Sequence, residues 1–133
     1  MKKHHFQIIA LLLLLSGVSF AQPRPAQADT KKVKVYYFHN TRRCETCLAV
    51  ENETKNALQT LFPQEMKKGS VEFVALNFDD NKNARLAQSL EISGQALVVI
   101  KEGKKTDLTN KAFLLARTNP EKFRQVIKEA VGQ

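Results

Sequence analysis

The stretch KVKVYYFHNTRRCETC, residues 32–47, contains both cysteines of the 133-residue chain. It begins with alternating charged and apolar residues and becomes continuously apolar at 35–38, a pattern typical of a strand that enters a two-sided core. After Cys47, the residues that would share one face of a helix recur three or four positions apart until Pro63. The sequence therefore predicts that Cys44 and Cys47 lie at the N-terminal end of a long helix. The residues expected on the repeating face of this helix are Leu48, Glu51, Lys55, Leu58, Leu61 and Phe62.

Strand and helix patterns alternate along the rest of the chain. The expected elements are a strand at 71–77, a short helix capped within 79–81, a buried strand at 96–100, a hairpin turn at 101–104 that leads into a strand at 105–109, helical turns at 110–117, and a last helix opened by Asn119 and Pro120. The residues expected on the core face of the last helix are Phe123, Val126, Ile127 and Ala130. The element order is β-α-β-α-β-β-α, and the first and third strands should be central because both are apolar.

The N-terminus has the features of a secretory signal peptide. A basic start precedes an apolar run at 8–15 and then small residues. We expect a signal peptide over residues 1–21, cleaved after Ala21 or, as an alternative, after Ala28, and a flexible leader over residues 22–31. Since the apolar run is too short to span a bilayer, the protein should be exported, to the periplasm or outside the cell, without spanning the membrane after the signal is removed.

The remaining residues, 32–133, are enough for one domain and too few for two separate cores. The chain has a formal net charge of +8, but its lysines are scattered. No basic stripe interleaved with aromatic residues, of the kind that stacks nucleic-acid bases, is visible. We therefore expect no nucleic-acid partner. We also expect a monomer. Export also places the cysteines in a compartment where disulfides persist.

The sequence resembles the thioredoxin superfamily over residues 33–131. The matching segments are VYYFHNTRRCETC at 35–47, VALNFDDNKNARLAQSLEISG at 74–94, ALVVIKEGKK at 96–105 and NPEKFRQVIKEAV at 119–131. Within the superfamily it is most similar to small exported bacterial thioredoxin-like proteins found alongside nitroreductase-type genes. The resemblance implies an α/β fold in which helices flank a four-stranded mixed sheet.

The position of the cysteines favours dithiol chemistry. A cysteine at the first turn of a helix faces unpaired backbone N–H groups and the positive end of the helix dipole, which favours the thiolate. Cys44 is therefore the expected nucleophile, and Cys47 can resolve a mixed disulfide by closing a disulfide to Cys44. Arg42 and Arg43 should stabilise the thiolate, whereas Glu45 should oppose it.

Two positions depart from the superfamily pattern. The resemblance places a cis-proline beside the cysteines, but the aligned residue here is Ala96. A cis bond between Gln95 and Ala96 would cost about 2.5 to 4 kcal/mol, so we expect a trans peptide there. The resemblance also implies a buried acidic residue where this chain has Phe38, and His39 is a candidate substitute for it.

The leading hypothesis is an exported thiol-disulfide oxidoreductase that passes reductant to specific partners. Its partners would be disulfide- or dithiol-bearing proteins, including an upstream redox partner, and its only redox group would be the Cys44–Cys47 disulfide, without a cofactor. The reductive direction is what the resemblance implies, because small exported thioredoxin-like domains more often relay reductant to particular partners.

Two alternatives stay open. One is a soft-metal-binding or metallochaperone-like module that uses Cys44, Cys47 and His39 as ligands. The other is a redox-inert thioredoxin-like binding domain. For Tyr36 and Tyr37 we expect strand packing. Asp79 and Asp80 should act as a helix cap without a catalytic role.

Overall fold

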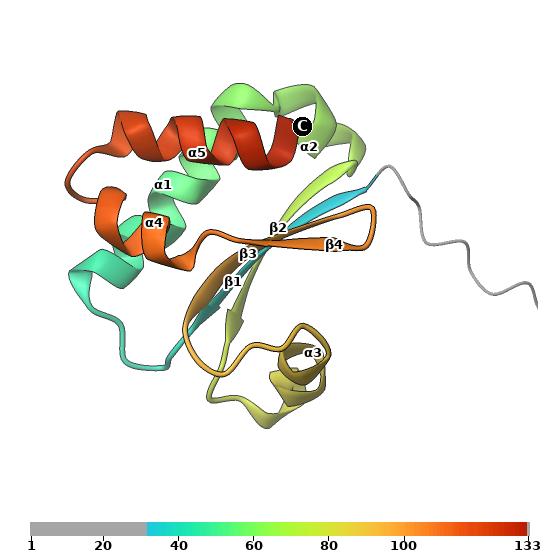
Figure 1. Cartoon of the computed structure of the whole chain (residues 1–133), viewed down its shortest axis with the longest axis vertical. Coiled ribbons are helices and arrows are strands. Elements are labelled where there is room, and N and C mark those ends of the chain that lie inside the picture. The colour runs from blue at the N-terminus through green and yellow to red at the C-terminus, as the bar shows by residue number, and fades with distance from the viewer. Residues whose placement is uncertain (1–31, 133) are drawn as a thin grey trace, which may run out of the picture.

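The computed structural model describes residues 32–132 (Figure 1). The strands are β1 (Val33–His39), β2 (Val71–Asn77), β3 (Ala96–Lys101) and β4 (Lys104–Asp107). The helices are α1 (Glu45–Leu61), α2 (Pro63–Lys68), α3 (Ala84–Ser89), α4 (Thr109–Leu115) and α5 (Pro120–Gly132), and a 3₁₀ turn at Asn81–Asn83 precedes α3.

The strands form one mixed sheet in the order β2-β1-β3-β4. β1 pairs in parallel with β2, with Val35 opposite Phe73, and antiparallel with β3, with Val35 opposite Val99. β4 pairs antiparallel with β3. The first and third strands are therefore central, as predicted. Helices flank this sheet, which confirms the predicted α/β class and thioredoxin-like architecture.

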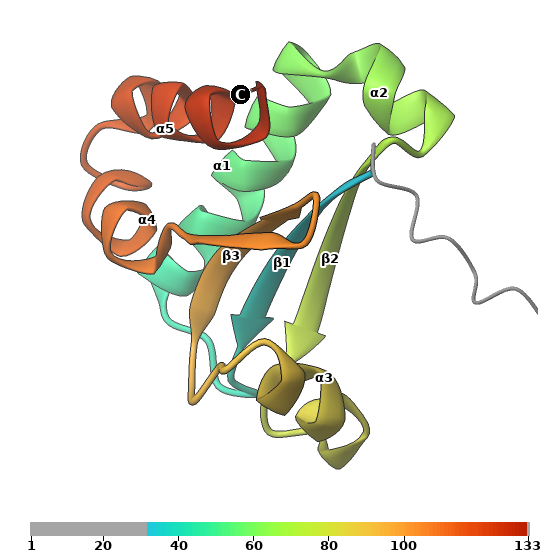
Figure 2. The same ribbon diagram turned by 45° about the vertical axis from the view of Figure 1, so that its right-hand side comes forward.

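Alternate residues of β1 enter two separate apolar clusters, one on each face of the sheet. Tyr37 belongs to the larger cluster, which is completed by residues of α1, α4 and α5. Phe38 points to the opposite face and packs in a smaller cluster with Ala87 of α3. Figures 1 and 2 show this division, with α1, α4 and α5 on one side of the sheet and α3 on the other. The continuous apolar run at the end of β1 is explained by this burial on both faces.

The helix boundaries differ from the prediction in two places. α1 ends at Leu61, just before Pro63 as predicted, but Pro63 also begins a second helix, α2, at a position where a missing N–H is harmless. The predicted cap at 79–81 is formed by Asp80, whose Oδ1 accepts a hydrogen bond from the backbone N–H of Lys82 at 3.1 Å. It caps the 3₁₀ turn, and α3 begins only after that turn.

The predicted repeating face of α1 is right at Glu51 and Leu58, which are buried, and wrong at its first residue. Leu48 is 43% exposed, whereas Cys47 and Val50 are buried against the sheet. The buried residues of α1 are Cys47, Val50, Glu51, Thr54, Ala57 and Leu58. The helix is thus rotated by about one residue from the predicted face, so that the second cysteine points into the core.

The C-terminal half of the chain agrees with the prediction more closely. The β3–β4 hairpin turns at Glu102 and Gly103, whose φ angles of 51° and 76° lie in the left-handed region. Asn119 caps α5, because its Oδ1 accepts a hydrogen bond from the backbone N–H of Lys122 at 3.0 Å. On α5, Phe123 is fully buried, as expected from its spacing.

The predicted signal peptide, residues 1–21, and the leader, residues 22–31, lie outside the described residues. The expected export and the domain bounds 32–133 therefore stay predictions. Within residues 32–132, no helix combines the length and the apolar character that crossing a membrane would need.

Candidate functional site

Cys44 is the N-cap residue of α1, as the sequence predicts. Its backbone is extended, and its Sγ accepts a hydrogen bond from the backbone N–H of Cys47 at 3.3 Å. Its side chain is exposed and is a free thiol. The pKa of Cys44 is lowered, first by a hydrogen bond with the Cys47 thiol and then by backbone N–H groups, including those of Cys47 and Thr46. These are the unpaired donors that every helix start presents.

Cys47 lies one turn inside the helix and is only 3% exposed. It is also a free thiol. Burial is the main cause that raises the pKa of Cys47 above its usual value, and the Cys44 thiol raises it further. The pair thus combines an accessible sulfur that ionises readily with a buried sulfur that retains its proton. This division is what an attacking and a resolving cysteine require.

We predict that this difference is visible in alkylation. In the reduced protein, Cys44 should react with iodoacetamide first, and its rate should reach a plateau at a lower pH than that of an ordinary cysteine, because its pKa is lowered. Peptide mapping by mass spectrometry across a pH series measures both sites in one sample. Equal labelling of Cys44 and Cys47 at every pH would contradict the assignment.

The guanidinium of Arg43, which was expected to stabilise the Cys44 thiolate, forms an ion pair with Glu51, which also pairs with Lys55 at 2.7 Å. Burial raises the pKa of Glu51, but Lys55 and Arg43 together outweigh it and hold the pKa below its usual value. A buried carboxylate without a cationic partner would destabilise the fold, and Arg43 supplies such a partner for Glu51.

The other charged residues near Cys44 in the sequence, Arg42 and Glu45, are exposed. Glu45, which was expected to oppose the thiolate, pairs with Arg117 at 3.0 Å. The lowered pKa of Cys44 is therefore due mainly to hydrogen bonds at the helix start, rather than to the neighbouring charged side chains.

The loop that leads to Cys44 is attached to the end of β2. The backbone N–H of Thr41 donates to Asp79 Oδ2 at 2.7 Å, and Asn77 Nδ2 donates to Thr41 Oγ1 at 2.9 Å. The sequence assigns Asp79 only to a helix cap, but the structure shows that its side chain binds the loop that precedes Cys44. The hydrogen bond from Thr41 is the largest cause of the lowered pKa of Asp79.

His39 ends β1 and packs its ring on Tyr37, with the ring centroids 5.8 Å apart. Its Nδ1 lies 3.0 Å from the carbonyl oxygen of Asn40, an acceptor, so Nδ1 carries the proton in this contact. Within residues 32–132, no three or more His, Cys, Asp or Glu side chains form a group that could hold a metal ion. The predicted triad of His39 with the two cysteines is therefore not assembled.

Tyr37 supports the site from the central strand. It is fully buried, and its hydroxyl donates a hydrogen bond to the carbonyl oxygen of Cys47 at 3.0 Å. Burial raises the pKa of the Tyr37 hydroxyl well above its usual value, so this group stays protonated and remains a donor. The predicted packing role is confirmed for both Tyr36 and Tyr37, and Tyr37 also fixes the first turn of α1 to the sheet.

Ala96 begins β3, where it is buried and paired with Phe38 of β1. Every peptide bond in the described part of the chain is trans, including the Gln95–Ala96 bond, as predicted. Phe38 occupies the smaller apolar cluster on the face away from α1.

Sequence reasoning missed Gln95 as a site residue. The Cys47 thiol donates a hydrogen bond to Gln95 Oε1 at 3.3 Å. A signal for this contact exists in the sequence, since Gln95 directly precedes the position that the superfamily places beside the cysteines. Glu51 was also missed as a buried acid, although its spacing of four residues from Lys55 is typical of a helical ion pair.

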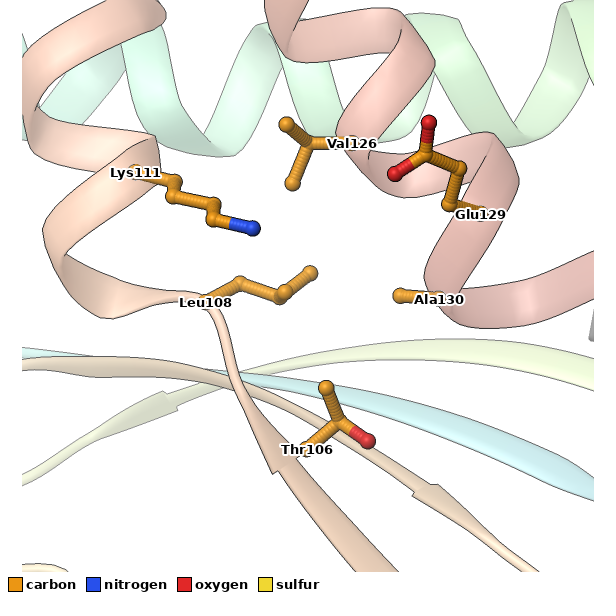
Figure 3. A pocket seen from close by; sticks show the side chains of 6 residues that line it. All are labelled: Thr106, Leu108, Lys111, Val126, Glu129 and Ala130. Carbon is orange, nitrogen blue, oxygen red and sulfur yellow. The ribbon is translucent and has the colours of Figure 1, made fainter.

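A hollow of about 200 Å³ lies elsewhere, between β4, α4 and α5 (Figure 3). Leu108, Val126 and Ala130 supply apolar walls, and Lys111 and Glu129 are exposed at its sides. None of its lining residues contacts the dithiol in any hydrogen bond or ion pair described for residues 32–132.

No protein-family model and no curated protein matches this chain. Among solved structures, it is similar to an X-ray structure of Fasciola hepatica thioredoxin, with 21% identity, a TM-score of 0.40 and coverage of 75% of this chain and 82% of that chain. It is also similar to a structure described as a malarial protein, with 16% identity, a TM-score of 0.42 and coverage of 62% of this chain and 93% of that chain. By its own sheet order, helix placement and cysteine pair at the start of α1, the chain has a thioredoxin-like fold with a Cys-x-x-Cys motif.

Proposed function

We propose that this protein is an exported thiol-disulfide oxidoreductase that relays reductant to specific partner proteins. The observation that supports this proposal most strongly is the contrast between Cys44 and Cys47. Cys44 is exposed and has a lowered pKa, whereas Cys47 is buried and has a raised one. A helix N-cap cysteine of this kind is a nucleophile, and a buried second cysteine one turn away can complete the exchange.

The reaction proceeds in two displacements. The Cys44 thiolate attacks one sulfur of a partner disulfide, so that a mixed disulfide forms and the first partner thiolate leaves. Cys47 then attacks Cys44 Sγ, releases the second partner thiolate and gives its proton to that thiolate or to water. Two electrons pass from the dithiol to the partner disulfide, and the protein is left with a Cys44–Cys47 disulfide. An upstream dithiol protein must reduce that disulfide before the next cycle.

The proposed location follows from the signal-peptide pattern at residues 1–21. The proposed partners are disulfide-bearing proteins in that compartment, because exported proteins are those in which disulfides persist. As the branch of the superfamily we propose the small exported bacterial thioredoxin-like proteins found alongside nitroreductase-type genes. The protein would act as a monomer, without a cofactor other than its own disulfide.

The test is equilibration of the purified protein in buffers of reduced and oxidised glutathione. Acid quenching, alkylation and mass spectrometry then measure the fraction of intramolecular disulfide. We expect a reversible two-electron transition between dithiol and disulfide, together with reduction of a disulfide-bonded test protein. A protein that forms no reversible disulfide would instead be a redox-inert binding domain. Copper or zinc at one equivalent in the same sample, lost on substitution of either cysteine, would support the metal-binding alternative.

A further inference from the structure

Gln95 reaches the dithiol from outside α1. Its side chain lies at the end of the loop between α3 and β3, and its Oε1 accepts the hydrogen bond from Cys47 Sγ at 3.3 Å. The backbone at this point is held by Ala96, which is buried and pairs with Phe38 in the central strand. Gln95 is itself half-buried. The contact therefore joins two elements that the sheet holds in place.

The chemistry of this contact depends on the redox state. A thiol has one proton to donate, and the amide oxygen of glutamine can accept it but cannot take it away as a base. A disulfide sulfur has no proton. The hydrogen bond between Cys47 and Gln95 can therefore exist in the dithiol and not in the disulfide.

We propose that Gln95 is a positioning residue of the dithiol centre, which shifts the equilibrium between dithiol and disulfide toward the dithiol. This inference rests on the proposed function and adds to it a residue that sets the redox balance. Because Cys47 is buried, its thiol has little access to water, and the amide oxygen gives the thiol proton an acceptor besides the Cys44 sulfur. Forming the disulfide removes this hydrogen bond.

The oxidation that Gln95 opposes can be written with oxidised glutathione as the oxidant. The Cys44 and Cys47 thiols lose two protons and two electrons in total, and one S–S bond forms between them. The S–S bond of glutathione breaks and takes up the two electrons and two protons, which gives two molecules of reduced glutathione. Gln95 exchanges no atoms in this reaction and acts only on the stability of the starting dithiol.

The first experiment measures the equilibrium constant of this reaction for the wild-type protein and three variants. Gln95→Leu removes the acceptor at similar side-chain size, and Gln95→Glu keeps an acceptor oxygen at the same reach. Gln88→Leu is the matched control, because Gln88 is exposed on α3 and makes no side-chain hydrogen bond described for residues 32–132. A thiol is a weak donor, so the expected effect of Gln95→Leu is a shift of about threefold toward the disulfide.

Gln95→Glu is expected to stay at the wild-type value or move toward the dithiol, and Gln88→Leu should not change the constant. The inference is overturned if Gln95→Leu has the wild-type constant, or if Gln95→Glu shifts as far toward the disulfide as Gln95→Leu. The second result would mean that any change of side chain at this position disturbs the loop. A wild-type protein that forms no disulfide would overturn the proposed function as well, which separates the two failures.

The second experiment observes the hydrogen bond without any redox reaction. In the Cys44→Ser protein, Cys47 supplies the only S–H group, so its stretching band in the infrared spectrum belongs to one residue. Addition of Gln95→Leu should move this band to higher frequency, as expected when a hydrogen bond is lost, while Gln95→Glu should not. An unchanged band in the Gln95→Leu protein would overturn the contact on which the inference depends.

Discussion

Under the proposed function, replacing Cys47 by serine is expected to make the protein retain disulfide-bonded proteins as long-lived mixed disulfides. Cys44 remains exposed and activated at the helix start, so it still attacks a disulfide, but no second thiol can release the product. Well-oriented intramolecular reactions have effective molarities of about 10⁵ M or more, so external thiol would release the partner far more slowly. The measurement is the lifetime of the mixed disulfide with a disulfide-bonded test protein, followed by non-reducing electrophoresis and mass spectrometry.

Cys44→Ser is the matched control, because it makes the same chemical change three residues away. It should abolish trapping, since the remaining Cys47 is buried and has a raised pKa. The nucleophile assignment is wrong if the Cys47→Ser protein traps nothing and also reacts with a thiol reagent no faster than the Cys44→Ser protein. Trapping by the Cys44→Ser protein alone would reverse the two roles.

The sequence predicts the fold correctly where the local pattern of residues agrees with the burial that the tertiary structure gives them. The sequence predicts β2 at 71–77 with both ends correct, because its β-type residues lie between a glycine turn and a polar segment. The face of α1 is predicted only in part, because helical spacing alone places Leu48 on the same side of the helix as the buried Leu58. The structure buries Cys47 and Val50 instead, because they lie toward the sheet.

Only the part of the candidate site that is local in sequence, the Cys44–Cys47 pair, can be predicted from the sequence. The relation of Cys44 to Cys47 follows from their spacing at a helix start, which needs no tertiary information. The contact of Cys47 with Gln95 joins residues 48 positions apart and depends on the path of a loop, which no periodicity encodes. Arg43 was assigned to the thiolate because the two residues are adjacent in sequence. It pairs with Glu51 because an unpaired carboxylate in a buried site costs more free energy than an unpaired thiolate that is exposed to water.

The stability of the site is expected to depend on α5, although no residue of that helix touches the cysteines in the contacts described for residues 32–132. Phe123 is fully buried in the larger cluster, where α5 packs against α1, the helix that begins at the dithiol. Phe123→Ala should lower the free energy of unfolding by about 3 to 5 kcal/mol, because it removes a large apolar side chain and leaves a cavity. A domain of this size has a total stability of about 5 to 15 kcal/mol, so this single change removes a large fraction of it.

Urea unfolding followed by circular dichroism measures this loss as a lower transition midpoint. Leu114→Ala is the control, because it also shortens a large apolar residue in a helix but at a side chain that is 68% exposed. Its effect should stay within about 0.5 kcal/mol. Equal midpoints for the two variants would mean that α5 does not pack on α1 as the structure has it. A large loss for Phe123→Ala alone would show that packing between α5 and α1, the helix that begins at the Cys44–Cys47 pair, stabilises the fold that carries the site.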